Sequence, residues 1–137
     1  MSNLFRDQEK FMKACDQSVT GDTAQFDMYV KLIEEEKTEL MQALAVGDQV
    51  ETLDALIDIL VVTIGAIHSA GFDGEAAWKE VMATNFAKIE ANGKVRKRED
   101  GKVLKPQGWE PPNLKPFLKK KVPLTSSPKL DPYLQTR

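Results

Sequence analysis

The stretch VETLDALIDILVVTIGAIH, residues 50–68, decides the fold. On a helical wheel its apolar side chains occupy nearly the whole circumference. Only three acidic residues, Glu51, Asp54 and Asp58, interrupt this apolar surface, and they share one face. A helix that is apolar on almost every side is normally covered by other elements. We therefore expect residues 49–70 to form the central, buried helix of the protein.

Further helices are expected on both sides of this segment. All seven prolines lie at or after Pro106, so the residues before it lack the strongest helix breaker. The expected helices cover residues 4–17, 23–46 and about 73–91. Gly47 can take a left-handed cap, and Asp48 can then N-cap the central helix. We therefore expect an all-α fold. Because the connections between the helices are short, neighbouring helices should be antiparallel, in a bundle of about four to five helices.

The apolar patterns of the first and last helices indicate which side chains face inward. For residues 4–17 the inward set is Leu4, Phe11, Met12 and Cys15. For residues 73–91 it is Trp78, Val81, Met82, Phe86 and Ile89. A chain of 137 residues suits one domain, which we place at residues 1–112. The basic, proline-punctuated residues 113–137 are expected to form an extended or disordered arm.

Composition excludes several kinds of protein. A single cysteine, Cys15, cannot form an intramolecular disulfide, and with only one histidine there is no plausible zinc site. The start of the chain has no apolar signal segment, and the most apolar run, residues 59–67, is too short to span a bilayer. We expect a cytoplasmic protein with no membrane partner. Basic residues gather after residue 92 but lack the repeated aromatic interleaving of a single-strand binding platform, so no nucleic-acid partner is expected.

The segment LIEEEKTEL, residues 32–40, carries an acidic residue where an apolar one would be expected. Glu36 falls in the middle of an apolar stripe, and Glu39 lies on its edge; the stripe is formed by Tyr29, Ile33, Leu40 and Leu44. Glu34 lies on the opposite, solvated side. Burial of a carboxylate is costly unless a cation neutralises it or it takes up a proton.

Two further carboxylates are expected to be buried without a neutralising partner. Asp54 and Asp58 lie one turn apart on the apolar central helix, and no Lys or Arg occurs between Lys37 and Lys79 to neutralise them. A bound divalent cation would do so. Because every candidate ligand is an oxygen, Mg²⁺ is expected, with Mn²⁺ as the other possibility. A single acid is more often surface or a cap than a ligand, and for Glu51, three residues after Asp48, a capping role suffices.

These acidic motifs resemble those of the all-α nucleoside triphosphate pyrophosphohydrolases, the MazG-like group that includes dimeric dUTPases and phosphoribosyl-ATP pyrophosphohydrolase. The resemblance rests on Glu35-Glu36-x-x-Glu39 followed by Asp54 and Asp58, and extends to DILVVTIGAIHSAGFD, TNFAKI and DGKVLKPQGW. It covers roughly residues 11–112. The resemblance implies metal ligation by Glu36, Glu39 and Asp58.

One departure from the family pattern concerns the second acidic motif. That motif is usually Glu-x-x-Asp, and if Asp58 is its Asp, the Glu position is Ala55 here. Asp54 then supplies the carboxylate from the adjacent turn, which leaves the number of metals open. The metal ligands are thus expected to be Glu36, Glu39, Asp54 and Asp58. The resemblance also implies that Glu35 is a ligand or positions the water, so the expected catalytic set is Glu35, Glu36 and Glu39.

Substrate contacts are expected from the later, basic part of the chain. Asn85 lies in the middle of an apolar helix face, where it is either a satisfied core amide or a substrate contact, and Lys88 follows it. By resemblance, the loop with Lys102 and Lys105 closes over the nucleotide phosphates. Trp109 either stacks on the base or anchors the loop. Gln17 is a weaker candidate for contact with a base, and His68 is expected to be a capping or interface residue.

The leading prediction is a Mg²⁺-dependent enzyme that cleaves between the α- and β-phosphates of a nucleoside triphosphate, giving monophosphate and pyrophosphate. Its role would be house-cleaning or balance of the nucleotide pool, with dUTP among the candidate substrates. The alternatives are the phosphoribosyl-ATP reaction and a non-catalytic helical module that binds a nucleotide or partner, for which Ala55 is the indication. The resemblance and the apolar central helix predict a homo-oligomer, a dimer or dimer of dimers.

Overall fold

The computed structural model describes residues 3–119. The helices, in chain order, are α1 (Leu4–Ala14), α2 (Thr23–Val46), α3 (Gln49–Ser69), α4 (Gly74–Phe86) and a short 3-10 helix, η1 (Lys115–Phe117). Within these residues the only β-type pairing is an isolated bridge between Lys97 and Val103. The predicted all-α fold class is confirmed. None of the helices in residues 3–119 has the length and apolar character needed to cross a membrane.

The chain divides into two compact units. Among the described residues, the first contains residues 3–74 with Leu118 and Lys119, and the second contains Glu75–Phe117. Of the predicted arm, residues 120–137 lie outside the described part of the chain, whereas residues 113–119 include η1.

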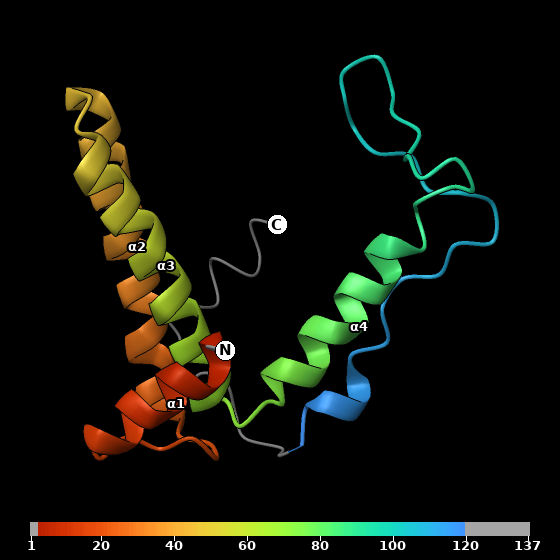
Figure 1. The fold of residues 1–137 in the computed structure, drawn as a ribbon. Helices are drawn as coiled ribbons and strands as arrows, with labels where there is room; N and C mark the ends of the chain where they lie inside the picture. The colour runs from red at the N-terminus through yellow and green to blue at the C-terminus, as the bar shows by residue number, and fades with distance from the viewer. Residues whose placement is uncertain (1–2, 120–137) are drawn as a thin grey trace, which may run out of the picture. The chain divides into compact units, whose positions relative to one another are not determined.

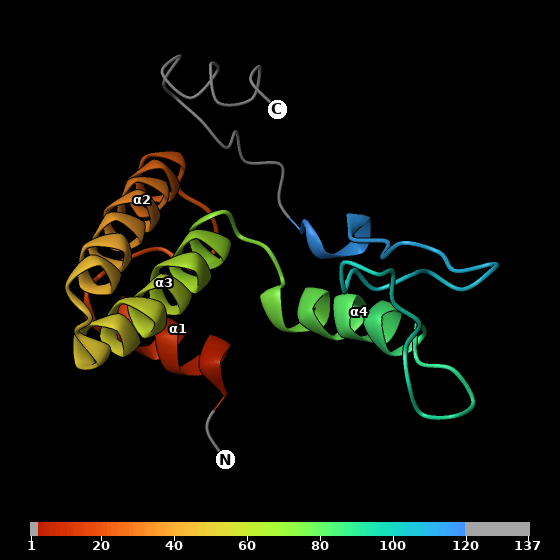
Figure 2. The same ribbon diagram turned by 90° about the horizontal axis from the view of Figure 1, so that it is seen from above.

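In the first unit α2 and α3 lie side by side, and α1 packs against α3 at one end of this pair (Figures 1 and 2). The turn between α2 and α3 follows the predicted capping signals. Gly47 has a left-handed φ of 70°, and its N–H donates to the carbonyls of Ala43 and Leu44. The Asp48 side chain then accepts from the N–H of Glu51, 3.0 Å away, and so caps α3. A turn this short makes α2 and α3 antiparallel neighbours.

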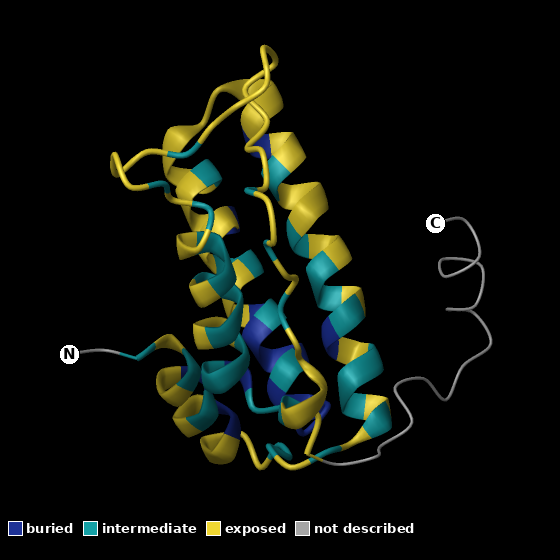
Figure 3. Ribbon diagram, turned by 90° about the vertical axis from the view of Figure 1, so that its right-hand side faces the viewer, coloured by how far each residue is buried: buried dark blue, intermediate teal, exposed yellow. Residues whose placement is uncertain are grey.

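The core of the first unit lies where all three helices meet. Its buried residues are Met12, Tyr29, Val62 and Ala66, with Val19, Phe26, Leu32 and Ile33 packed against them. Accordingly, the half of α3 after Val62 is largely buried, whereas the half beside the α2–α3 turn is largely exposed (Figure 3). The expectation that α3 is buried along its whole length is therefore wrong within this unit. Val50, for example, is 77% exposed.

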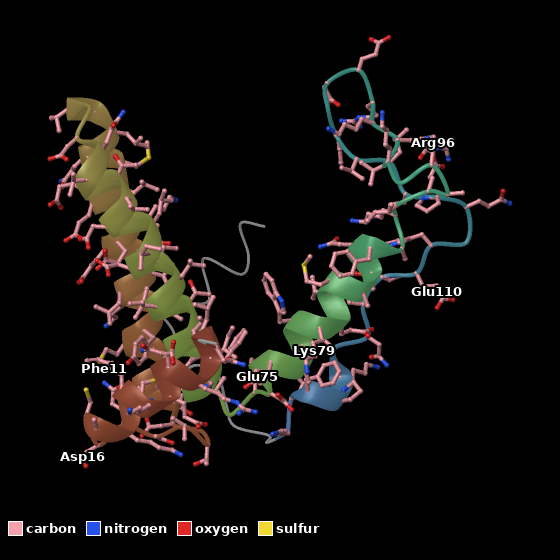
Figure 4. All side chains as sticks on the ribbon, viewed as in Figure 1. Phe11, Asp16, Glu75, Lys79, Arg96 and Glu110 are labelled. Atoms are coloured by element: carbon pink, nitrogen blue, oxygen red, sulfur yellow. The ribbon has the colours of Figure 1, made fainter. Side chains whose placement is uncertain are left out.

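The prediction for the first helix also needs correction. The helix ends at Ala14 rather than Gln17, and Asp16 takes a left-handed φ of 57° just beyond it. Of the four side chains predicted to face inward only Met12 is buried; Phe11 is 62% exposed (Figure 4), and Leu4 and Cys15 are exposed as well. The reason is that α1 buries a narrow stripe of Gln8 and Met12, one turn apart. Leu4 and Cys15 lie at the two ends of the helix.

In the second unit the chain leaves α4, forms a loop that contains Arg96, and returns alongside the helix to η1 (Figures 1, 2 and 4). Two contacts tie the returning segment to α4. The indole N–H of Trp109 donates to the carbonyl of Thr84, 2.7 Å away, and the N–H of Asn113 donates to the Glu80 carboxylate, 2.8 Å away.

The predicted end of the fourth helix, about Ala91, is five residues too late, because α4 stops at Phe86. The last carbonyls of a helix need partners from outside the helix. Trp109 supplies one for Thr84 from 25 residues along the chain. A helix end fixed by a distant side chain is not visible in the local sequence. Trp78, Phe86 and Ile89, predicted to face inward, are largely exposed.

Candidate functional site

The acidic residues of α2 are placed by a helix that begins at a side-chain cap. Asp22 accepts from the N–H of Gln25, 2.9 Å away, and α2 then continues without interruption to Val46. Glu35 and Glu39 are exposed, as is Glu34, whereas Glu36 is half-buried. The Oε2 atom of Glu36 is buried and has no hydrogen-bond partner among the described residues. A buried carboxylate oxygen without a partner carries a large desolvation cost.

On α3 the three acidic residues differ in their surroundings. Glu51 is exposed, and its N–H bonds to the Asp48 cap, but the reciprocal capping-box bond predicted for its carboxylate is not formed. The N–H of Asp48 donates to the Ala43 carbonyl, so the Glu51 carboxylate is not needed to satisfy it. Asp54 is exposed and Asp58 is half-buried.

The electrostatics show that the two helices bring four of these carboxyl groups together. Burial, a hydrogen bond with Glu39 and the charges of Glu39, Asp58 and Asp54 raise the pKa of Glu36 from 4.5 to about 7. Burial and the neighbouring charges of Asp54 and Glu39 also raise the pKa of Asp58. We refer to Glu36, Glu39, Asp54 and Asp58 as the acidic cluster.

The acidic cluster has the chemistry of a site for a hard cation. Its ligands are oxygens from two adjacent helices, and it includes the unpartnered Oε2 of Glu36. Among residues 3–119 no three acidic, cysteine or histidine side chains already surround a common point at which a metal ion could bind. The charges of these carboxyl groups nevertheless act on one another, as the raised pKa values of Glu36 and Asp58 reflect. This is the arrangement expected of ligands whose mutual repulsion a divalent cation would offset.

Ala55, which takes the Glu position of the family motif if Asp58 is its Asp, is buried, with 3% of its surface exposed. A methyl group at this position adds no charge to the cluster. The carboxylate nearest to it in sequence is that of Asp54, which points to solvent.

The predicted substrate residues lie in the second unit, and two of them, Lys88 and Lys105, lie over the aromatic ring of a third, Trp109. The ammonium groups of Lys88 and Lys105 lie 5.0 Å and 4.9 Å from the centroid of the Trp109 ring. Asn85, half-buried, does not bridge helices. Its Oδ1 accepts from the Lys88 ammonium at 3.1 Å, and its amide nitrogen lies 3.7 Å from the sulfur of Met82.

Lys102 lies apart from this group, in a hairpin-like turn. Its backbone N–H donates to the Asp100 carboxylate, and its carbonyl accepts from the N–H of Arg98. Arg98 and Asp100 form an exposed ion pair at 2.6 Å, in agreement with a solvated charged run. Glu80, which holds the returning segment, was not predicted, because nothing in its local sequence distinguishes it from a surface glutamate.

Gln17 and His68 have structural partners in the first unit. The hydroxyl of Tyr29 donates to Oε1 of Gln17 at 2.5 Å, so this amide is already engaged. His68 is buried, and its Nε2 lies 2.8 Å from the carbonyl oxygen of Phe5. These contacts agree with the interface role expected for His68.

Comparison with known protein families matches residues 8–85 to the model of phosphoribosyl-ATP pyrophosphohydrolase. The matched segment covers more than half of the chain and contains the acidic cluster, whereas Lys88, Lys105 and Trp109 lie beyond it. No curated protein matches the chain. The family match indicates pyrophosphohydrolase activity in general, and pyrophosphohydrolases of this family generally depend on a divalent metal. The chain therefore belongs to the phosphoribosyl-ATP pyrophosphohydrolase family, within the MazG-like nucleoside triphosphate pyrophosphohydrolase superfamily.

Proposed function

We propose that this protein is a Mg²⁺-dependent nucleotide pyrophosphohydrolase that cleaves the α–β phosphoanhydride of nucleoside triphosphates. The products are a nucleoside monophosphate and pyrophosphate. The observation that carries the proposal is the buried, unpartnered carboxylate oxygen of Glu36 among three further carboxyl groups from α2 and α3. Two of these acids, Glu36 and Asp58, are half-buried, and no Lys or Arg occurs between Lys37 and Lys79 to neutralise them.

Each acidic residue has a defined part in this proposal. Glu36, Glu39, Asp54 and Asp58 hold the cation. Once bound, Mg²⁺ would neutralise charge on the phosphoanhydride and on the leaving pyrophosphate. Glu35, exposed next to Glu36 in sequence, orients the attacking water or takes a proton from it.

A second candidate is hydrolysis of phosphoribosyl-ATP, and the observation that favours it is the description of the matched family model. The same acidic cluster could serve both reactions, because both break a phosphoanhydride between α- and β-phosphates. A non-catalytic binding module is the third candidate, for which Ala55 remains the only indication.

The decisive experiment measures pyrophosphate release by the purified chain. The substrate panel contains the common nucleoside triphosphates, dUTP and phosphoribosyl-ATP, each with Mg²⁺, with Mn²⁺ and with chelator. Metal-dependent release from nucleoside triphosphates supports the proposal, and release from phosphoribosyl-ATP alone supports the second candidate. Lack of release from every substrate indicates a binding module.

Variants connect that activity to the cluster. Glu36→Gln and Asp58→Asn should each lower turnover by about a hundredfold or more, since a metal ligand contributes several kcal/mol to the transition state. Glu34→Gln is the matched control, because it makes the same chemical change on the exposed side of the same helix. Full Mg²⁺-dependent turnover in Glu36→Gln would contradict the assignment.

We also propose that the active form is a homo-oligomer, a dimer or dimer of dimers. Apolar side chains at the start of α3, among them Val50, Leu53 and Ile57, are not covered by the first unit. Sedimentation of the wild type and of Leu53→Lys tests this. A monomeric wild type would contradict it.

A further inference from the structure

Helix α4 is covered along one side by the segment that returns beside it. The carboxylate of Glu80 accepts from the N–H of Asn113, and the carbonyl of Thr84 accepts from the indole N–H of Trp109. Glu80 and Thr84 are one helical turn apart, so they lie on the same side of α4. We refer to this as the covered side.

The opposite side of α4 is apolar and exposed. At 3.6 residues per turn, Trp78, Met82 and Phe86 form a row that faces away from the covered side. Trp78 and Phe86 are each 59% exposed. A hollow of about 420 Å³ opens on this row, lined by Trp78, Lys79, Met82, Ala83 and Phe86. A contiguous row of large apolar side chains is typical of an interaction surface. We refer to it as the open side.

The described part of the chain ends next to the first residue of α4. The ammonium group of Lys119 lies 3.5 Å from the carboxylate of Asp73, and Asp73 directly precedes α4. Lys119 takes a left-handed φ of 47°, a conformation that residues other than glycine adopt mainly at turns. The arm that follows therefore starts at the N-terminal end of α4, at a point where the chain turns.

The start of the arm matches the open side of α4 in the order of its charged and apolar residues. On α4, Glu75 comes about one turn before Trp78 and lies on the same side. In the arm, residues 119–121 are all lysines, and the apolar Val122 and Leu124 follow them. Basic and then apolar residues of the arm thus meet acidic and then apolar residues of the helix.

The arm is long enough to reach this surface. An extended chain advances at most about 3.4 Å per residue, so Leu124 can lie up to about 17 Å from Lys119. Met82 lies about 12 Å along α4 from Gly74, since a helix rises about 1.5 Å per residue. Leu124 can therefore lie level with Met82 after the chain has passed round the start of the helix.

From these observations we propose that the open side of α4 is the docking surface for the arm of the same chain. Val122 packs against Trp78 and Leu124 packs against Met82, and burial of this apolar surface stabilises the contact. The lysines at the start of the arm direct it to this side through the acidic residues at the start of the helix. The proposal is independent of the proposed function, because neither a metal nor a nucleotide takes part.

The first test joins the arm to α4 by a disulfide in the full chain. In a Cys15→Ser background, Met82→Cys is combined with Leu124→Cys. Two cysteines form a disulfide only where their Cα atoms come within about 7 Å. Mild oxidation should therefore link these two positions within one chain, as shown by mass spectrometry of the unreduced peptides.

The matched control moves one cysteine to the covered side. Ala77→Cys lies near the level of Trp78 but faces the returning segment, so with Leu124→Cys it should stay reduced. Equal disulfide formation in the two pairs would overturn the proposal. So would a disulfide between two chains, since it would place a second copy of the protein on the open side.

A second measurement needs no engineered thiol. Hydroxyl-radical oxidation of the full chain, read by mass spectrometry, reports how far Trp78 is exposed. Val122→Asp with Leu124→Asp should raise its oxidation, whereas Thr125→Asp with Ser126→Asp adds the same charge to the arm and should not. The tryptophan of the returning segment is the internal reference.

The outcomes separate the arm from other occupants of the open side. Equal oxidation of Trp78 in the wild type and in the Val122→Asp, Leu124→Asp variant would overturn the proposal. Protection that persists in that variant and disappears on dilution would assign the open side to a second copy, which also overturns it. Metal and nucleotide are absent throughout, so the presence or absence of turnover does not affect the result.

Discussion

Tyr29 of α2 lies directly against Gly65 of α3, so closely that a Cβ atom at position 65 would overlap the tyrosine ring. Both residues are buried, and Tyr29 belongs to the core with Met12, Val62 and Ala66. The missing side chain at position 65 is what lets the two helices approach here. The alignment of α2 with α3, on which the acidic cluster depends, therefore rests on this contact.

Gly65→Ala should destabilise the protein by about 1–3 kcal/mol, since overpacking of a dense core forces side chains or backbone to shift. Alanine's better helix propensity offsets only part of this cost. Urea unfolding measures the change. In a Tyr29→Leu background the same substitution should cost less, because the ring is absent. An equal cost in both backgrounds would show that the ring contact is not responsible.

The parts of the fold that sequence predicted well are those fixed by local signals. The bounds of α2, the left-handed Gly47 and the Asp48 cap all follow from residues within one turn of the helix ends. The parts of the fold that were predicted wrongly depend on contacts with residues far away in the sequence. The end of α4 is set by Trp109, and the burial of α1 is set by which of its faces meets α3.

In the candidate site, too, some features follow from the local sequence and others depend on the folded structure. Helical periodicity alone placed Glu36 in an apolar face, and the raised pKa values of Glu36 and Asp58 show that this face brings acids together. The family resemblance groups Lys102 with Lys105 in one loop, but it does not show which of them lies near Trp109. Lys105 reaches Trp109 because of the turn at Gly108, whereas Lys102 lies in a hairpin with Asp100. No periodic pattern distinguishes these two lysines.

His68 should prove to be a structural residue. Its Nε2 bonds to the Phe5 carbonyl, and its ring meets the Phe5 ring edge-on at 6.3 Å, so it joins α3 to α1. His68→Leu should lower the free energy of unfolding by about 1–2 kcal/mol through loss of this buried bond. Turnover per folded molecule should stay unchanged. Loss of turnover with full stability would instead assign His68 to the chemistry.

The stability of the metal-free protein should depend on pH through Glu36. Its pKa is about 7 in the folded state against an ordinary value of 4.5, so the folded state holds the extra proton between these values. Stability therefore falls as pH rises from about 4.5 to about 7 and levels off above that. Asp58, whose pKa is also raised, adds to the fall in the same direction. Thermal unfolding in chelator across this range measures it.

Glu36→Gln tests the assignment of that pH dependence. The amide cannot ionise, so the fall in stability over this range should become smaller, and at pH 8 the variant should be more stable than the wild type. Glu34→Gln, exposed on the same helix, should retain the wild-type profile. If the two variants behaved alike, a different group would be responsible.

Addition of a divalent cation should reverse the destabilisation at neutral and higher pH. A ligand that binds only the folded state stabilises it by about 2.7 kcal/mol at a concentration one hundred times its Kd. Mg²⁺ or Mn²⁺ should therefore raise the melting temperature at pH 8 and flatten its pH dependence, because the cation offsets the repulsion among Glu36, Glu39, Asp54 and Asp58. Ca²⁺ is a useful comparison, since it prefers more oxygen ligands at longer distances.

This measurement needs no turnover, so it tests the metal site independently of the reaction. Asp58→Asn should lose most of the cation-dependent rise, whereas Glu34→Gln should keep it. Ala55→Glu adds a carboxylate at a buried position of the second acidic motif. It should therefore lower the melting temperature in chelator and enlarge the rise on adding Mg²⁺. Equal stabilisation by Mg²⁺ in the wild type and in Asp58→Asn would place the cation elsewhere in the protein.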